Sequence, residues 1–543
     1  MGNVSILDCT LRDGGRIINC EFSDQDILDI TRELTDANIN IVEMGFLRDQ
    51  RQVDYQGNST FFTDVKQIEA FIPKDRKNTE YVAFIDFDMY DFAQLGECTG
   101  RSVTGLRFGF TKKQLAARKQ EILNSMRRIK QQGYRLFVQG VNTPAYSDKE
   151  LLKLVDIMNE IKPYSFGIVD TYGSMYLDDI GHYYDLVDYN LDRGICIDIH
   201  SHNNFQLSFA FAQEIIARSE GKRQVILDAT LEGMGKCAGN LNTELLVDYL
   251  VRKKGYSYKF DNILDIIDNY LYKIKHRYNW GYSVPAFMAG IYKSHPNNII
   301  YLTEKFRMDT RDIKNIISMI DEDTRQRYDY NNIERLYIAY NENKDGDSSH
   351  IRELGQSMEG RSVLMLIPGY SLVSQKQIIE NYVKEENPVI VSVNFVSQFE
   401  ESYVFWGNAK RYQLEKKRMH VPHEDILCTN VAKRQEGAYI VDYHKLICQG
   451  FKYFDNSAIM CLNLLDILGV TQLAIAGFDG FDLHKENNYI DESFVNDRCV
   501  DEYDEVNDEI YSMLVDYFDR ISDRCKVFFL TPSRFEGALS KHA

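Results

Sequence analysis

Short apolar runs alternate with longer amphipathic segments along the first 290 residues of the chain. The runs are rich in β-branched and aromatic residues, which is typical of buried strands. They lie at residues 5–10, 39–46, 81–86, 103–110, 134–142, 165–173, 195–204 and 224–233. The segments between them follow a helical period, as at Ile27, Ile30 and Leu34, and Ser23 is placed to cap that helix. Eight such units predict a (β/α)8 barrel over residues 1–300.

The pattern changes after residue 300. Residues 301–345 have a helical and increasingly polar pattern, and residues 346–360 lose apolar periodicity, so we expect a helical extension followed by a linker. Residues 361–543 again alternate strand-like runs with helical segments, which predicts a separate Rossmann-like α/β domain. Its strand-like runs lie within 361–372, 387–396, 402–412, 437–443, 470–481 and 525–533.

Composition and charge exclude several classes of function. A formal net charge of −18 argues against a nucleic-acid or anionic-membrane partner, because both reward clustered Lys and Arg. The ten cysteines are scattered, without a CxxC pair, and no basic leader or run of eighteen apolar residues occurs. We therefore expect a cytoplasmic protein with no membrane span that acts on small molecules.

Polar residues close several of the predicted barrel strands. The active sites of (β/α)8 barrels lie at the C-terminal ends of the strands, so these residues are candidates for the site. They are Thr10, Arg12, Asp13, Glu43, Arg107, Asp170, Thr171, His200, His202, Asn203, Asp228 and Thr230.

The most specific of these is the sequence HSH at residues 200–202. Residues i and i+2 of a strand face the same side, so His200 and His202 would both point into the barrel. With Asp13 from the first strand they would form a facial set of two histidines and one carboxylate that leaves positions open for substrate. Two hydrogen-bonded histidines on an outer loop are the alternative, but the strand end and Asp13 favour a metal site. Arg12 would then stabilise an oxyanion beside the cation.

Five motifs resemble those of the DRE-TIM metallolyases, the HMG-CoA-lyase-like superfamily: LDCTLRDGG, IVEMGF, VDTYG, HSHNN and GMGKCAGNLNTE. The resemblance covers roughly the first 300 residues. It implies a divalent metal, Mn²⁺ or Mg²⁺ with Zn²⁺ or Co²⁺ as alternatives, held by Asp13, His200 and His202. It also implies a pyruvate-type enolate stabilised by Arg12, substrates that are a 2-oxo acid and an aldehyde, and a homo-oligomer. The reaction would be aldol cleavage or condensation, or a Claisen condensation.

Two details distinguish the branches of this superfamily. Residues 233–240, GMGKCAGN, lack the Glu-Arg pair usual in the Claisen synthases, which favours the 4-hydroxy-2-oxovalerate aldolase branch. That branch has a histidine base three residues after the metal aspartate, where this chain has Arg16. Arg16 would instead bind a carboxylate or phosphate of the acceptor. Tyr172 and Tyr282 are the remaining candidates for proton transfer, and each can equally serve packing or binding.

The C-terminal half carries its own candidate ligand site. Gly369, Ser371, Asn394, Asn408 and Asp479 fall at predicted strand ends, on the side where such sheets bind ligands. The order of its strands loosely resembles the sialyltransferase-like domains of surface-polysaccharide clusters, which implies a nucleotide or nucleotide-sugar ligand. The other explanation is that these residues cap helices and turns.

The leading hypothesis is therefore a metal-dependent carbon-carbon lyase, an aldolase acting in surface-sugar biosynthesis. The alternatives are a Claisen-type synthase using an acyl-CoA and a 2-oxo acid, and a non-catalytic barrel fused to a nucleotide- or sugar-binding domain.

Overall fold

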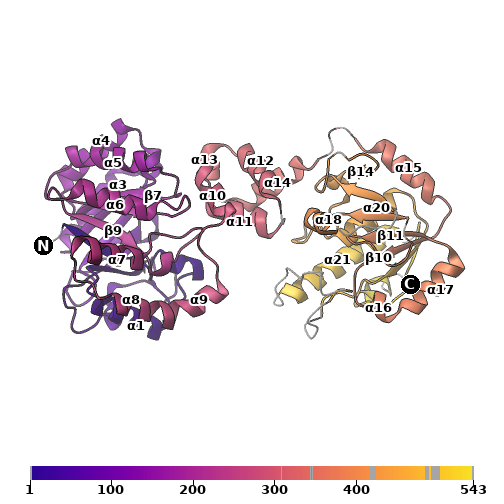
Figure 1. Ribbon diagram of the computed structural model, residues 1–543, viewed down its shortest axis with the longest axis horizontal. Coiled ribbons are helices and arrows are strands. Elements are labelled where there is room, and N and C mark those ends of the chain that lie inside the picture. Colours follow the sequence, from indigo (N-terminus) through magenta and orange to yellow (C-terminus); the bar gives the residue numbers. More distant parts are fainter. Residues whose placement is uncertain are drawn as a thin grey trace. The chain divides into compact units, whose positions relative to one another are not determined.

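The chain folds into two units (Figure 1). The first comprises Met1–Ile300 and Ile320–Tyr328, and the second comprises Tyr301–Met319 and Asp329–Ala543. The computed structural model describes residues 3–306, 308–342, 344, 346–400, 402–415, 423–433, 435–482, 488–490, 502–521 and 523–540. The predicted fold class, a parallel barrel with a separate α/β domain, is confirmed.

A closed parallel barrel forms the first unit. Its strands, within the described residues, are β1 (Val4–Asp8), β2 (Ile41–Leu47), β4 (Glu80–Asp86), β5 (Gly105–Thr111), β6 (Arg135–Val141), β7 (Ser165–Asp170), β8 (Cys196–Ser201) and β9 (Val225–Ala229). The ring closes where β1 pairs with β2, in the register Leu7 to Ile41. A short strand that the sequence pattern missed, β3 (Phe61–Phe62), pairs with the end of β2.

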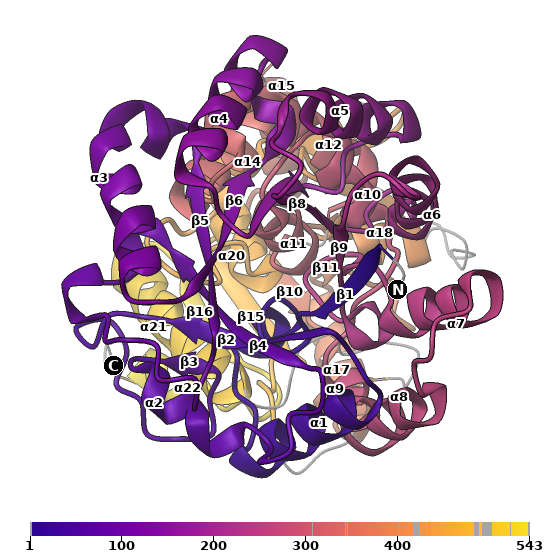
Figure 2. The ribbon, with the colours of Figure 1, turned by 90° about the vertical axis from the view of Figure 1, so that its left-hand side faces the viewer.

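Helices surround the barrel strands, and Figure 2 shows α3 to α7 on the outside of the ring. The helices that begin in this unit are α1 (Asp24–Asp36), α2 (Val65–Ile68), α3 (Lys112–Gln131), α4 (Asp148–Ile161), α5 (Leu177–Asn190), α6 (Ser208–Ser219), α7 (Thr243–Lys254), α8 (Phe260–Ile266), α9 (Tyr272–Arg277), α10 (Val284–Ile291), α11 (Pro296–Glu304) and α13 (Glu322–Arg325). The shorter turns are η1 (Gly14–Ile18), η2 (Glu69–Phe71), η3 (Phe87–Met89), η4 (Phe92–Gln94), η5 (Thr143–Ala145), η6 (Leu231–Gly233) and η7 (Ile267–Leu271). Ser23 caps α1 as predicted, because its side chain accepts a hydrogen bond from Asp26 N.

The barrel interior is filled in layers, as alternate strand residues point inward. Apolar side chains fill the lower layer: Leu7, Ile41, Val82, Phe137 and Ile226. Polar and charged side chains lie further along the same strands, toward their C-terminal ends. This apolar floor separates the candidate site from the opposite end of the barrel.

Asp8 is a buried carboxyl group near the top of β1. Thr243 Oγ1 donates to its Oδ2 at 2.7 Å, and Thr10 N donates to its Oδ1 at 3.0 Å. Burial raises the pKa of Asp8 to about 6. Between about pH 4 and this value the folded chain holds a proton that the unfolded chain has lost, so stability falls as the pH rises through that window.

The variant Asp8→Asn removes this titration. We expect it to raise the free energy of unfolding by up to about 3 kcal/mol above pH 7 and to change it little near pH 4. Urea unfolding followed through Trp280, in a Trp406→Phe background that leaves one tryptophan in the chain, measures both values. An equal change in the free energy of unfolding at the two pH values would contradict a raised pKa of Asp8.

The second unit contains a parallel sheet whose described strands follow the order β14-β13-β12-β11-β10-β15-β16. These are β10 (Val363–Leu366), β11 (Val389–Val393), β12 (Tyr403–Trp406), β13 (Glu424–Cys428), β14 (Tyr439–Val441), β15 (Gln472–Ala476) and β16 (Lys526–Phe529). Its helices are α12 (Thr310–Met319), α14 (Tyr330–Tyr340), α15 (Ser348–Met358), α16 (Ser371–Ser374), α17 (Lys376–Glu386), α18 (Ala409–Glu415), α19 (Tyr443–Leu446), α20 (Ser457–Ile467), α21 (Tyr503–Ile521) and α22 (Glu536–Ser540).

Two features of this unit differ from the sequence expectation. Strand β13 was not predicted, and residues 346–360, expected to be a linker, contain the helix α15. Leu354 and Met358 of α15 are buried, and the helix packs on β14. Residues 346–360 are therefore part of the fold of the second unit. Among the described residues, no helix is both long and apolar enough to cross a bilayer.

Candidate metal centre and active site

Three potential metal ligands meet at the C-terminal end of the barrel: Asp13, His200 and His202. One donor atom from each lies within 4.8 Å of the other two. Asp13 Oδ2 is 3.9 Å from His200 Nε2 and 3.8 Å from His202 Nε2. These separations exceed a hydrogen bond and suit three ligands of one shared ion.

Asp228 fixes the orientation of the His200 ring. Its Nδ1 lies 2.9 Å from Asp228 Oδ2, which leaves Nε2 directed toward Asp13. A carboxylate behind a ligating histidine is the usual outer-shell arrangement at metal sites. Cys9 also lies near His200 and Asp228, but its thiol donates to Ala229 O at 3.4 Å, and that group contains one histidine where the Asp13 group contains two. Asp13 is the better third ligand.

The protonation states of the three groups suit a cation. Burial lowers the pKa of His200 and of His202 to about 4, so both imidazoles are neutral at pH 7. Burial alone would raise the pKa of Asp13, but Arg12 and the two histidines hold it well below the usual range. Two neutral imidazoles and one carboxylate form a donor set that fits a divalent metal.

Asn240 is a further residue of this centre. Its Nδ2 donates to Asp13 Oδ2 at 3.0 Å, and its Oδ1 is buried without a hydrogen-bond partner among the described residues. The same Nδ2 donates to Met234 O at 3.1 Å, so Asn240 fixes the orientation of the Asp13 carboxylate. The sequence analysis quoted this residue within GMGKCAGN but gave it no role.

Arg12 is held rigidly beside Asp13. Its Nε donates to Glu43 Oε2 at 2.6 Å, and its Nη1 donates to Asp13 Oδ1 at 2.5 Å. The guanidinium carbon lies 4.6 Å from the centre of the Phe84 ring. Burial disfavours the charged form, but Glu43 and Asp13 outweigh it and raise the pKa of Arg12. The result is a fixed positive charge next to the candidate metal centre.

An ionic layer around Arg107 supports this centre. Arg107 Nη2 contacts Asp228 Oδ2 at 2.5 Å and Asp198 Oδ2 at 3.2 Å, and Nη1 contacts Glu43 Oε2 at 3.1 Å. Burial raises the pKa of Asp198 to about 7 and that of Asp228 to about 6. Arg107 thus holds together carboxylates that orient both Arg12 and His200.

A cavity of about 220 Å³ opens above these residues. Of the residues predicted from the sequence, it is lined by Arg12, Asp13, Arg16, Arg107, Thr171, Tyr172, His200 and His202. Tyr172 donates its hydroxyl proton to Gln326 O at 3.3 Å. Arg16 lies with its side chain 39% exposed and its Nε 3.4 Å from Asp13 Oδ1.

Four predicted substrate contacts lie outside the lining of this cavity as described. Glu43 holds Arg12 and Arg107, and Asp170 accepts from Ser174 N and Met175 N. Asn203 Oδ1 accepts from Ser208 N at 3.2 Å, and Tyr282 is 60% exposed. Each of these side chains has a local structural role or faces solvent.

The cavity also contains residues that the sequence analysis did not assign to it, notably His295, Lys236 and Gln139. Burial, with Lys236 and Arg16 nearby, lowers the pKa of His295 to about 4, so its ring is neutral at pH 7. Its Nδ1 accepts a hydrogen bond from Asn297 N at 3.2 Å, which leaves the ring proton on Nε2. His295 follows α10 and lies beyond the barrel strands, so the rule of strand ends could not point to it.

The fold and the donor set together define a (β/α)8 protein with a candidate metal centre, and comparisons identify its class. Residues 3–269 match the HMGL-like family model. A 4-hydroxy-2-oxovalerate aldolase from Moorella thermoacetica is 24% identical over 57% of this chain and 90% of its own. A homocitrate synthase from Pyrococcus horikoshii is 23% identical over 48% of this chain and 69% of its own. The first unit therefore belongs to the HMGL-like family.

Solved structures also match this chain. The N-terminal domain of a putative aldolase from Bacteroides vulgatus is 22% identical, with a TM-score of 0.49, over 57% of this chain and 99% of that one. An HMG-CoA lyase from Brucella melitensis is 14% identical, with a TM-score of 0.39, over 49% of this chain and 96% of that one.

Proposed function

We propose that this chain is a divalent-metal-dependent aldolase that makes or cleaves a carbon-carbon bond next to a 2-oxo acid. The observation that carries this proposal is the meeting of Asp13, His200 and His202 beside Arg12, in a cavity of small-molecule size. A divalent ion bound there would act as a Lewis acid on the oxygens of the 2-oxo acid and favour its enolate.

Arg12 would stabilise the negative charge that develops on the substrate. Its Nε and Nη1 are used by Glu43 and Asp13, and its Nη2 donates to no other described residue. A fixed donor in a buried site needs no reorganisation when charge appears, which is the basis of electrostatic stabilisation. The same charge pairs hold the guanidinium in place between turnovers.

Arg16 and Lys236 would bind the acceptor. Both line the cavity, and the side chain of Arg16 is partly exposed toward it. Burial lowers the pKa of Lys236, and the nearby Arg16 adds to this effect. Two cations beside the centre favour an aldehyde that carries a carboxylate or a phosphate group.

His295 would donate a hydrogen bond from Nε2 to the aldehyde oxygen, in place of the histidine that Arg16 replaces. We expect His295→Ala to lower turnover about a hundredfold, the effect of losing one positioned donor, and to leave Mn²⁺ affinity unchanged. The matched control is His276→Ala, since His276 is an exposed histidine of the same unit. Equal loss in both variants, or loss of metal binding in His295→Ala, would contradict this role.

Metal-dependent cleavage of 4-hydroxy-2-oxo acids tests the proposed function. The protein is stripped with a chelator, supplied with Mn²⁺ or Mg²⁺, and followed by release of pyruvate from a series of 4-hydroxy-2-oxo acids. We expect pyruvate only with metal, and faster for substrates with an anionic aldehyde part. Release of thiol from acetyl-CoA in the presence of a 2-oxo acid would instead support a Claisen-type synthase.

A further inference from the structure

The second unit contains a cavity of its own, of about 210 Å³, at the C-terminal edge of its sheet. Strand β11 pairs with one side of β10, and β15 pairs with the other side, so the order of the strands reverses between β10 and β15. Open α/β sheets bind ligands in the crevice at such a reversal. Residues following both strands line the cavity: Ile367, Pro368 and Gly369 after β10, and Gly477 and Phe478 after β15.

The floor of this cavity is preformed. Gly369 N donates to Gly477 O at 3.1 Å. A Cβ atom on Gly369 would lie 2.3 Å from that oxygen, and one on Gly477 would lie 1.8 Å from Ile367 O. Glycine at both positions lets the two loops pack backbone against backbone. Asp479 fixes the same region, because its Oδ2 accepts from Ser371 N at 2.8 Å. Asp479 and Ser371, two of the predicted ligand contacts, therefore shape the site.

Asparagine is the most frequent polar residue in the lining of the cavity. Asn394 Oδ1 accepts from Gly407 N at 3.0 Å, and Asn456 Oδ1 accepts from Ala458 N at 3.0 Å. The Nδ2 groups of both asparagines make no hydrogen bond within the part of the chain that the structure describes. Asn430 Nδ2 donates to Gly407 O at 2.9 Å, and its buried Oδ1 has no hydrogen-bond partner among the same residues. The cavity thus offers neutral donors and an acceptor to a ligand.

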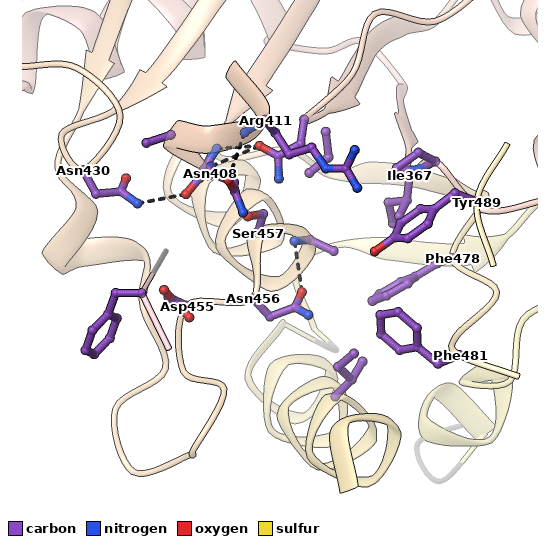
Figure 3. A pocket seen from close by; sticks show the side chains of 18 of the residues that line it. Ile367, Asn408, Arg411, Asn430, Asp455, Asn456, Ser457, Phe478, Phe481 and Tyr489 are labelled. Carbon is purple, nitrogen blue, oxygen red and sulfur yellow. Dashed lines mark hydrogen bonds between the residues drawn. The ribbon is translucent and has the colours of Figure 1, made fainter. Parts of the chain in front are cut away.

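Aromatic side chains gather on one side of the cavity. Figure 3 shows Phe478, Phe481 and Tyr489 together there, with Asn430 and Asp455 on the opposite side. The rings of Phe481 and Tyr489 meet edge to face, with centroids 6.4 Å apart. One face of the Phe481 ring is stacked on Tyr503, with centroids 5.1 Å apart, so the cluster offers its remaining apolar surface to a flat ring of a ligand.

The charges of the lining argue against a ligand that is held mainly by cations. Four carboxylates line the cavity, Asp309, Asp312, Asp455 and Asp479, against two cations. Lys305 is paired with Glu334, and the guanidinium carbon of Arg411 lies 5.3 Å from the centre of the Tyr489 ring. Carboxylates and amide oxygens accept hydrogen bonds from hydroxyl groups, and amide nitrogens donate to hydroxyl and base oxygens. The lining therefore fits a ligand that joins a flat aromatic ring to a polyhydroxylated sugar.

We propose that this cavity binds a nucleoside, with the base against Phe478, Phe481 and Tyr489 and the sugar toward Asn430 and Asp455. The nucleoside could be free or part of a nucleotide or a nucleotide-sugar, since the contacts named here are those of base and sugar. This site belongs to the second unit and is independent of the aldolase proposal for the first.

The test is a titration of the full chain with adenosine, guanosine, cytidine and uridine and with their 5′-monophosphates, followed by saturation-transfer NMR and calorimetry. We expect one base to be preferred, with saturation transfer strongest on base protons. Comparison of the nucleoside with its monophosphate distinguishes a free nucleoside from a nucleotide source. Failure of every one of these probes to bind at millimolar concentration would overturn the proposal.

Two variants locate the binding. Phe481→Ala should weaken binding of the preferred probe roughly tenfold, the usual cost of losing one stacking ring. Asn430→Ala should also weaken its binding, because the variant lacks the Oδ1 acceptor. Tyr370→Ala is the control, because Tyr370 is an aromatic residue of the same unit, 49% exposed and outside the cavity lining. Circular dichroism of each variant separates loss of contacts from loss of fold.

Undiminished binding in folded Phe481→Ala and Asn430→Ala proteins, or equally tight binding of glucose, would also overturn the proposal. Asp13→Asn should bind the probe as the unaltered chain does. Failure of nucleoside binding and failure of the aldolase proposal can therefore be told apart.

Discussion

Replacement of Asp13 by asparagine is expected to weaken Mn²⁺ binding by about a thousandfold, or about 4 kcal/mol, and to abolish turnover. Asp13 supplies the one carboxylate of the three-residue donor cluster, and its pKa lies well below the usual range. Asparagine keeps the size of the side chain but removes the charge. The neutral imidazoles of His200 and His202 would then hold a divalent cation without charge compensation.

Calorimetric titration of the chelator-treated protein with Mn²⁺ measures this effect. Asp86→Asn is the matched control, because Asp86 lines the same cavity but pairs with Arg48 at 2.8 Å. We expect the control to keep the Mn²⁺ affinity of the unaltered chain. If Asp13→Asn and Asp86→Asn bound Mn²⁺ equally well, Asp13 would not be a metal ligand.

The second large effect is a loss of folding stability, which we expect for the variant Arg107→Met. Arg107 is fully buried and contacts Glu43, Asp198 and Asp228. Methionine fills much of the same space but leaves Asp198 and Asp228 without a cationic partner, and Glu43 with Arg12 alone. Removal of one partner of a buried ionic network costs about 3–5 kcal/mol, and we expect a loss in that range.

Urea unfolding through Trp280, in the Trp406→Phe background, measures the loss for the barrel. Arg135→Met is the control on the neighbouring strand, where Arg135 pairs with Glu80 with its own side chain 56% exposed. An exposed pair of this kind contributes at most about 1 kcal/mol. A loss for Arg107→Met no larger than that for Arg135→Met would show that the ionic layer does not stabilise the barrel.

Most of the architecture could be predicted because the barrel strands are buried on both faces. Their apolar runs are continuous and recur at regular intervals, which is the strongest signal that a parallel sheet leaves in a sequence. Helix α15 was missed because its described buried residues are few, with Leu354 and Met358 one turn apart, and the rest of its surface is polar. Strand β13 begins with Glu424 and Asp425, which masked its apolar half, Ile426–Cys428.

The site was only partly predictable, because the sequence does not show how far along the barrel axis each inward-facing residue lies. The alternation of a strand tells which residues face the interior but not how far along the barrel each one lies. Glu43 and Arg107 face inward as expected, yet they belong to the ionic layer that holds Arg12 and His200 from below. Asp170 lies at the end of its strand, but its carboxylate turns to cap the following loop.

Residues brought in by tertiary folding left no local signal. His295 reaches the cavity from the segment after α10, and its own sequence surroundings show no catalytic motif. Asn240 meets Asp13 although 227 positions separate them in the chain. Only the closed barrel brings these two residues to the candidate centre.

Exchange of the methyl protons of pyruvate for deuterium tests the central claim most directly, because it reports enolisation without requiring the acceptor. The protein is incubated with pyruvate in D₂O with Mn²⁺, the ion is removed by chelation before the NMR spectrum is recorded, and a chelated sample and His202→Ala serve as controls. The account predicts metal-dependent loss of the methyl signal that vanishes in both controls. Exchange that persists in the chelated protein, or in His202→Ala at an unchanged rate, would contradict a metal centre at Asp13, His200 and His202.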